Sequence, residues 1–213
     1  LNPDKLGGYS GYDATLVGHD ASNPIGSFER QHNMNYNRRL MGYIFGEYEI
    51  IKNLQFRSTL GYVTTEFLNK NLVLKTDMTP KNFSNTTLEE TSSWDYNWVW
   101  ENMLTYQKVF GDHDLTVMGA YTSEYRKFHS IIASGNTIQN DGNDILKMPE
   151  AGEAVDGNEW ETSRISYLGR LMYSFKGRYM LTANFRRDGS SKFGSGNKWG
   201  NFPSASVAWR ISD

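Results

Sequence analysis

Residues 186–210, RRDGSSKFGSGNKWGNFPSASVAWR, decide the fold of this chain. Residues 179–186 before the loop and 203–211 after it both alternate apolar and polar side chains. A period of two residues predicts a β-strand with two unlike faces. The glycines, serines and asparagine of residues 188–197 interrupt regular pairing and predict a loop. The stretch is therefore predicted to be a strand, a loop and a second strand.

The same pattern extends over most of the chain and predicts seven strands in an all-β fold. Residues 1–38 are rich in Gly, Asn, Asp and Ser and contain Pro3 and Pro24, so we expect an irregular loop there. The expected strands cover residues 40–51, 55–68, 94–110, 114–130, 163–175, 178–187 and 202–211.

The connections between these strands alternate between short and long. Short turns are expected at 52–53, 111–113 and 176–177, and long connections at 69–93, 131–162 and 188–201. In outer-membrane barrels the periplasmic turns are short and the extracellular loops are long. Several strands also exceed the ~10 residues needed to cross a bilayer. We therefore predict an antiparallel transmembrane β-barrel segment that this chain alone does not close.

Side-chain alternation is clearest in residues 94–110, where Trp98 and Trp100 share one face and Asn97 and Glu101 share the other. In a soluble sandwich the aromatic face would pack into a core. In a barrel it would meet lipid, and the polar face would line a water-filled lumen. Periodicity leaves both alternatives open, whereas the loop pattern favours the barrel. We expect Trp98 and Trp100 on the outer surface, with Asn97 and Glu101 inside.

Composition excludes several classes of protein. The 213 residues carry a formal charge of −2, which gives no electrostatic footprint for nucleic acid. Cysteine is absent, so neither a disulfide framework nor a thiolate metal site is expected. Mean hydropathy is −0.62 although there are 13 Tyr and 6 Trp, a combination that suits half-polar barrel strands. Because Leu1 is not a start methionine, we expect an internal piece of a longer protein.

Two blocks of sequence resemble SusC-like (SusC/RagA) TonB-dependent outer-membrane transporters. One block is Glu47-Tyr48-Glu49-Ile50 with Leu54–Ser58 and Gly61-Tyr62. The other is the opening stretch, in which Lys192, Trp199 and Ala208 depart mildly from the family pattern. Its matching residues are Arg187, Asp188, Gly189, Ser190, Ser191, Phe193, Gly194, Gly200, Phe202, Pro203, Ser204, Trp209, Arg210 and Ile211.

The resemblance implies a function as well as a fold. Such proteins import oligosaccharides or peptides across the outer membrane of Gram-negative, Bacteroidetes-type bacteria. They work with a SusD-like surface lipoprotein outside and receive energy from TonB through a plug domain. The resemblance thus implies that residues 1–213 are part of the barrel, embedded in outer-membrane lipid, and that the plug domain and TonB box lie elsewhere. It also explains residues 187–194 as loop structure.

No catalytic constellation is expected, and the protein is predicted not to be an enzyme. Asp188 with Ser190 or Ser191 has no histidine nearby in sequence to activate a hydroxyl. The four histidines, at 19, 32, 113 and 129, lack metal-ligand spacing. Residues 140–144, NDGND, hold oxygen ligands that could suit Ca²⁺, but they lack the full calcium-loop pattern. A solvated acidic loop and the absence of any cofactor are favoured.

A row of arginines is the strongest candidate for function, because on the polar face these side chains would line the lumen. They could line a substrate path, or they could form ion pairs within the wall or with the plug, for example with Asp95, Glu101 and Glu124. The second interpretation is favoured. The row comprises Arg57, Arg126, Arg164, Arg170, Arg186 and Arg210, and Glu101 is a further candidate for lining the lumen.

Two alternatives to active import remain open. One is a soluble secreted β-sandwich that binds carbohydrate through Trp160 or Trp199. The other is a passive porin-like barrel, which an upstream plug domain would exclude.

Overall fold

The computed structural model describes residues 25, 28, 30–78, 81–83, 85–136 and 151–212, and most of them are β-strand. No helix in these ranges is both long and apolar enough to cross a membrane. The strands are β1 (Gln31–Ile51), β2 (Leu54–Val73), β3 (Thr76–Met78), β4 (Lys81–Phe83), β5 (Thr87–Phe110), β6 (His113–Asn136), β7 (Ala151–Phe175), β8 (Tyr179–Ser190) and β9 (Trp199–Trp209).

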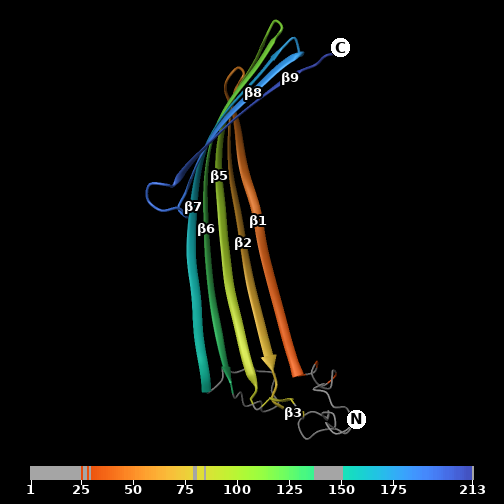
Figure 1. Cartoon of the computed structure of the whole chain (residues 1–213), viewed down its shortest axis with the longest axis vertical. Coiled ribbons are helices and arrows are strands. Elements are labelled where there is room, and N and C mark those ends of the chain that lie inside the picture. The colour runs from red at the N-terminus through yellow and green to blue at the C-terminus, as the bar shows by residue number, and fades with distance from the viewer. Residues whose placement is uncertain are drawn as a thin grey trace. The chain divides into compact units, whose positions relative to one another are not determined.

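Seven of the strands form one antiparallel sheet in the order β1-β2-β5-β6-β7-β8-β9 (Figure 1). Each strand pairs with its neighbour in sequence, except that β3 and β4 form a separate hairpin between β2 and β5. The order ends at β1 and β9, so the sheet has two open edges and does not close. The predicted barrel segment of about seven strands is confirmed.

Contacts group the chain into two units, which are described separately. The first unit comprises residues 1–38, 65–94 and 128–159. The second comprises residues 39–64, 95–127 and 160–213, and it contains the short turns and the signature block.

The three short turns lie at one end of the second unit, as the loop pattern predicts. The amide of Gln107 donates to the Asn53 carbonyl at 3.0 Å, and that of Lys176 donates to the Asp112 carbonyl at 2.7 Å. These bonds join each turn to the next pair of strands. Asn53 and Gly111 have φ values of 71° and 59°, which suit residue types that tolerate the left-handed region.

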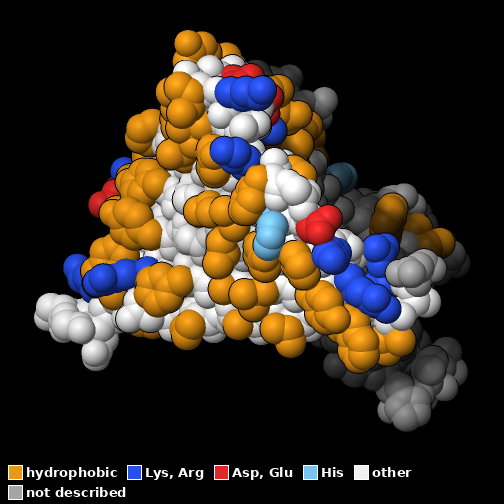
Figure 2. Space-filling model, turned by 90° about the horizontal axis from the view of Figure 1, so that it is seen from above, with side chains coloured by type: hydrophobic (Ala, Val, Ile, Leu, Met, Phe, Trp, Pro, Cys, Tyr) orange, Lys and Arg blue, Asp and Glu red, His pale blue; other side chains and the backbone are white. Residues whose placement is uncertain are grey.

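The sheet has almost no hydrophobic core of its own. Among the described residues only two apolar side chains are buried, Leu72 and Leu88 in the first unit. Tyr43, Tyr48 and Val207 are 73%, 68% and 82% exposed. Figure 2 shows hydrophobic side chains over much of the visible surface, with charged side chains gathered in smaller clusters. So much exposed apolar surface is unusual for a protein in water and marks a surface that something else covers.

The strands are longer than the sequence predicts. Residues 31–38, expected to be loop, belong to β1, and the expected loop 69–93 begins in β2 and ends in β5. Segment 131–162 likewise contains the end of β6 and the start of β7, and segment 188–201 contains parts of β8 and β9. Polar residues dominate these strand ends, so they lack the apolar alternation that marks a strand. Backbone pairing with a neighbouring strand holds them in place regardless.

We predict that residues 1–213 expressed alone form no soluble monomer. Two unpaired edges and an uncovered apolar face both favour association in water. Size-exclusion chromatography and thermal unfolding in detergent-free buffer test this. A monodisperse monomer with a cooperative melting transition would contradict the barrel-segment fold.

Candidate functional site

The two faces of the sheet differ in chemistry, and strand register in the second unit defines them. In the β7–β8 pair, Arg170 lies opposite Asn184 and Ser166 opposite Asp188. These residues belong to one face, the charged face. Tyr173 lies opposite Leu181 on the other, which we call the aromatic face. The alternation predicted for these strands is therefore confirmed.

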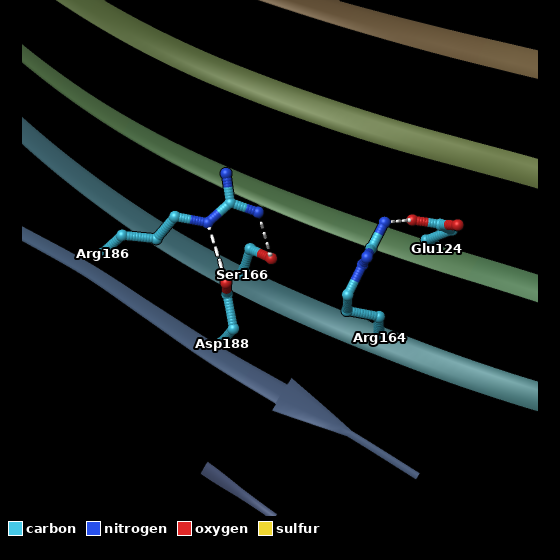
Figure 3. A network of polar contacts seen from close by, with 5 residues as sticks. All are labelled: Glu124, Arg164, Ser166, Arg186 and Asp188. Atoms are coloured by element: carbon cyan, nitrogen blue, oxygen red, sulfur yellow. Dashed lines mark hydrogen bonds and ion pairs between the residues drawn. The ribbon is translucent and has the colours of Figure 1, made fainter. Parts of the chain in front are cut away.

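Arginines on the charged face bond to side chains of the same strand and of neighbouring strands. Arg164 on β7 pairs with Glu124 on β6 (Figure 3). Arg186 on β8 donates from Nε to the Asp188 carboxylate at 2.8 Å and from Nη2 to the Ser166 hydroxyl at 3.3 Å. Ser166 is only 6% exposed, so the Arg186 head lies over a tightly packed point of the sheet.

The same arrangement recurs in the other strands. Arg126 on β6 donates from Nε to Asp95 Oδ1 on β5 at 2.9 Å. Arg57 on β2 donates to Glu47 on β1 at 2.9 Å. Arg170 donates to the Asn184 side chain at 2.6 Å. Each arginine thus bonds to at least one neighbour in the wall.

This network agrees with the favoured interpretation of the arginine row. Asp95 and Glu124 are ion-pair partners, as expected. Glu101 lies six residues after Asp95 on β5, and this even spacing places it on the same face. Arg210 lies elsewhere: its Nη2 is 3.2 Å from the position a Cβ would take on Gly177, in the β7–β8 turn. Whether any of these residues lines a lumen stays a prediction.

A row of rings crosses the aromatic face near the short turns, and we call it the turn-side row. His113 stacks on Phe110 with centroids 5.2 Å apart and accepts or donates a 2.6 Å hydrogen bond at Nδ1 with the Tyr173 hydroxyl. Tyr179 stacks on Trp209 at 6.3 Å. The row comprises Phe110, His113, Tyr173, Phe175, Tyr179 and Trp209.

A second row, the loop-side row, crosses the same face farther along the strands. Trp98 stacks on Tyr125 at 6.1 Å, and Trp100 meets Tyr121 edge to face at 6.3 Å. The Trp100 indole also donates to Ser58 Oγ at 3.0 Å. The row comprises Trp98, Trp100, Tyr121, Tyr125, Tyr167 and Trp199.

The separation of the two rows matches the dimensions of a membrane barrel. Trp100 and Phe110 are ten residues apart on β5. At about 3.4 Å per residue this is ~34 Å along the strand, and a strand tilt of about 40° reduces it to ~26 Å. Barrels carry an apolar band ~25 Å tall between two aromatic girdles. The aromatic face thus has the pattern of a lipid-facing surface, with Leu104 near its middle.

The signature block is held together by close contacts around Trp199. Arg187 places its guanidinium carbon 4.8 Å from the Trp199 ring centroid, and Tyr167 stacks on the same ring at 6.1 Å. Gly189 lies directly opposite Trp199, where a Cβ would approach the ring to 2.9 Å. Only glycine leaves room for the indole at this point. This contact explains Gly189 as structural, in keeping with the resemblance.

The serines of the block fasten the loop to β7. The Ser191 amide donates to the Ser163 carbonyl at 2.9 Å, and the Ser191 hydroxyl accepts from the Ser163 amide at 2.8 Å. The Ser190 amide donates to the Lys198 carbonyl at 3.0 Å. Asp188, Ser190 and Ser191 are therefore engaged in structural bonds, and none of them contacts a histidine among these bonds.

Trp160 lies beside this block between two cations. The Arg126 guanidinium carbon is 5.2 Å from its ring centroid and the Lys192 ammonium is 6.0 Å away. In the sandwich alternative Trp160 would bind carbohydrate, whereas a ring held by its neighbours would anchor the base of the loop instead. The two cation contacts agree with anchoring.

In the first unit, polar contacts fix the strand ends around the β3–β4 hairpin. The Leu74 amide donates to the Arg30 carbonyl at 3.0 Å, and the Thr86 hydroxyl accepts from the Lys75 amide at 2.9 Å. Burial lowers the pKa of the Arg30 guanidinium from its usual value, because water no longer solvates the charge fully.

The calcium candidate at residues 140–144 lies outside the described residues. Within the described ranges, no three His, Asp or Glu side chains gather to hold a metal ion. His113 stacks in the turn-side row, and His129 lies 3.2 Å from Glu159 and stacks on Trp94 at 5.6 Å. His32 lies in β1, and His19 is outside the described residues.

Sequence reasoning missed two contributions to these faces. Glu47 was not foreseen as the partner of Arg57, because residues 40–51 have rings on both faces and so no clear frame. The Arg57 guanidinium lies 4.6 Å from the Phe45 ring centroid, which puts Phe45 on the charged face. The second omission is the stacking of aromatic rings from neighbouring strands. Which rings meet depends on how the strands are paired, and that register is not evident from the sequence.

No protein-family model matches the chain. It is 30% identical over 203 residues to the TonB-dependent receptor P39 of Formosa agariphila, covering 90% of this chain and 19% of that protein. It is 25% identical over 198 residues to the TonB-dependent receptor SusC of Bacteroides thetaiotaomicron, covering 90% and 19% respectively. The chain thus spans about a fifth of the length of the curated relatives it matches.

Solved structures show the same fold. The RagAB peptide importer in its open-open state superimposes with a TM-score of 0.82 at 18% identity, covering 92% of this chain and 22% of that one. Another RagAB peptide transporter structure gives a TM-score of 0.78 at 20% identity, covering 86% and 21%. The seven-stranded sheet is therefore similar to one part of that larger barrel.

We predict that Gly189→Ala destabilises the barrel, by about 1–3 kcal/mol, because the new methyl group overlaps the Trp199 ring. Gly194→Ala is the matched control, since nothing lies within 4 Å of a Cβ there. Urea unfolding of the full-length protein in detergent, followed by heat-modifiability on gels, measures the difference.

A second background makes the Gly189 test specific. In a Trp199→Ala protein the added methyl group meets open space, so Gly189→Ala should cost much less there than in the parent. Equal losses in both backgrounds would contradict the proposed steric cause.

Proposed function

Because the chain is a barrel segment of a SusC-like TonB-dependent transporter, we propose that the whole protein imports oligosaccharides or peptides across the outer membrane. One observation carries the proposal. A single-layered sheet has, on one face, two rows of aromatic rings separated by about the thickness of a membrane, and, on the other face, charged side chains. A barrel wall needs this combination, because lipid covers one side and water the other. The proposal that transport is driven by TonB rests on the similarity to TonB-dependent receptors.

The charged face supports a wall whose charges are neutralised locally. Arg57, Arg126, Arg164 and Arg186 each pair with a carboxylate of the described wall. Pairs as exposed as these contribute only ~0–1 kcal/mol each. Their effect is to leave no large single-sign field along this part of the wall, which suits neutral oligosaccharides or mixed peptides better than strongly anionic cargo.

Partners follow from the same proposal. A SusD-like surface lipoprotein would cover the extracellular side, and TonB would act through a plug domain elsewhere in the protein. A passive porin-like barrel would need neither. A soluble carbohydrate-binding sandwich is disfavoured, because the aromatic face has no second layer in the described part of the chain.

Uptake by a deletion strain tests the function. The strain should lose growth on one class of polymer, either an oligosaccharide or a peptide mixture, while it keeps growth on the corresponding monomers. Complementation should fail when TonB is depleted. Uptake that continues without TonB would favour the passive porin instead.

Substitutions to arginine test which face meets lipid. Leu104→Arg on the aromatic face should destabilise the assembled barrel by ~2–4 kcal/mol near the bilayer midplane, and Trp100→Arg in the loop-side row by only ~0–1 kcal/mol. Thr105→Arg, one residue away on the charged face, is the matched control and should fold normally. Urea midpoints in lipid bilayers measure all three.

This series also checks the orientation of Glu101. If the charged face lines the lumen, Glu101→Arg folds as well as the parent protein, because the side chain stays in water. Destabilisation by Glu101→Arg or Thr105→Arg larger than that by Leu104→Arg would reverse the assignment of the faces.

Epitope tags test the topology. A tag at Gly194, in the connection between β8 and β9, should bind antibody on intact cells. A tag at Asp112, in the β5–β6 turn, should bind only after the outer membrane is permeabilised. Labelling of the Asp112 tag on intact cells would invert the proposed orientation.

A further inference from the structure

Three asparagines of β1 and β2 bond to one another in the first unit. Asn69 on β2 donates from Nδ2 to Oδ1 of Asn33 at 3.0 Å and to Oδ1 of Asn35 at 2.6 Å. Asn35 donates from Nδ2 to Asn33 Oδ1 at 3.0 Å. We call these three residues the amide cluster. All three hydrogen bonds are exposed, so the cluster lies open on the surface of the sheet.

The amide cluster belongs to the charged face. Along β2, Asn69 follows Arg57 at an even spacing, and along β1, Asn35 precedes Glu47 at an even spacing. Arg57 and Glu47 form an ion pair on the charged face. Both strands therefore place the asparagines on that face.

The positions around the amide cluster carry no charge. On this face, residues 31–37 of β1 and 65–73 of β2 include no Lys, Arg, Asp or Glu. The neighbours of the cluster there are Gln31, Asn37, Thr65, Phe67, Asn71 and Val73. The ion pairs described above for the second unit have no counterpart at these positions.

Asparagine is a poor residue for a strand. It is depleted in strands, where Thr and Val are favoured, and its side chain competes with the backbone for hydrogen bonds. Threonine would make an equally polar wall and would suit the strand better. Positions that work against their own secondary structure are expected where side chains perform a function. Five asparagines nevertheless share this face of the two neighbouring strands: Asn33, Asn35, Asn37, Asn69 and Asn71.

The internal bonds use half of the hydrogen-bonding capacity of the amide cluster. Each amide has two N–H donors and an oxygen with two acceptor positions. Within the cluster, Asn33 keeps both of its donors, Asn69 keeps both acceptor positions, and Asn35 keeps one of each. Unused donors and acceptors therefore lie side by side along the cluster.

We propose that the amide cluster is a binding subsite for a neutral oligosaccharide on the inner wall of the barrel. A hydroxyl both donates and accepts hydrogen bonds, so two neighbouring sugar hydroxyls pair with one amide, the first donating to its oxygen and the second accepting from its nitrogen. Phe67, two residues before Asn69 on the same face, offers an apolar ring to the C–H face of the sugar. The inner, extracellular placement rests on the proposed function.

The absence of charge around the cluster favours sugar over peptide. At neutral pH a free peptide carries an ammonium group and a carboxylate at its ends. Each of these charges loses hydration in a site that offers no opposite charge, and this loss opposes binding. A neutral sugar has no such charge to desolvate. The inference thus narrows the proposed cargo from oligosaccharides or peptides to oligosaccharides.

An ion pair on the opposite face provides the control. Lys70 follows Asn69 directly and pairs with Glu90 at 3.4 Å. Because successive residues of a strand point to opposite faces, this pair points away from the amide cluster. Replacing it alters the same stretch of wall without touching the cluster.

Uptake by whole cells tests the subsite. The probes are neutral oligosaccharides from partial hydrolysis of starch, laminarin, xylan and mannan, and a tryptic digest of casein. The complemented deletion strain should take up the oligosaccharides of at least one polymer and gain no uptake of casein peptides. Replacing Asn33, Asn35 and Asn69 together by threonine should raise the oligosaccharide concentration for half-maximal uptake about 25-fold, which is fivefold for each of two lost hydrogen bonds. The maximal rate should change little.

Matched variants separate binding from assembly. Lys70→Thr with Glu90→Thr should take up oligosaccharide like the parent. Threonine favours strands, so the triple variant should reach the outer membrane in the parent's amount and unfold at no lower temperature. Asn69→Thr alone, expected to raise the half-saturating concentration about fivefold, covers the case in which the triple variant fails to assemble.

Three outcomes would overturn the proposal. One is half-maximal uptake at the same concentration in the asparagine variants and the parent. Another is an equal loss in the Lys70/Glu90 variant. The last is uptake of casein peptides without uptake of any neutral oligosaccharide, which would refute the subsite and leave the proposed import function standing. Uptake of neither class would refute the import function itself.

Discussion

Backbone hydrogen bonding between neighbouring strands is the interaction on which this structure depends. A soluble domain adds a packed core to such a ladder, but here the described residues bury only Leu72 and Leu88 among their apolar side chains. Every other large apolar residue whose burial the structure describes is at least partly open to whatever surrounds the sheet. The ladder therefore sets the geometry, while the surroundings of the two faces decide whether that geometry is stable.

Alternate residues of each strand form the two faces, and the two faces are stabilised by different interactions. On the aromatic face, rings meet across strands in two rows, and the glycine at 189 makes room for the indole of Trp199. On the charged face, Arg57, Arg126 and Arg164 reach sideways to carboxylates on adjacent strands, and Arg186 pairs with Asp188 on its own strand. Because each interaction joins near neighbours, register errors would break both sets together, and each face helps to fix the register of the other.

Sequence alternation was sufficient for the sheet and for much of the charged face. It predicted the short turns, the order of seven strands, and Asp95 and Glu124 as partners of arginine. Alternation did not predict the outer ends of the strands. Both faces of the sheet are polar there, so the sequence shows no apolar–polar alternation that would mark a strand. It also failed at Glu47, because Tyr43 and Phe45 place rings on the charged face of β1. Close approaches such as that of Trp199 to Gly189 depend on register, which sequence alone did not supply.

The strand order bears on how such a sheet can form. Apart from the step over the β3–β4 hairpin, every strand pairs with the strand next to it in sequence. Contact order is correspondingly low for an all-β protein, and low contact order favours rapid folding because little loop entropy is lost before pairing begins. Such a sheet can zip together one hairpin at a time, each finished hairpin presenting a fresh edge as the template for the next. A lineage could lengthen or shorten the wall by whole hairpins without rebuilding the rest.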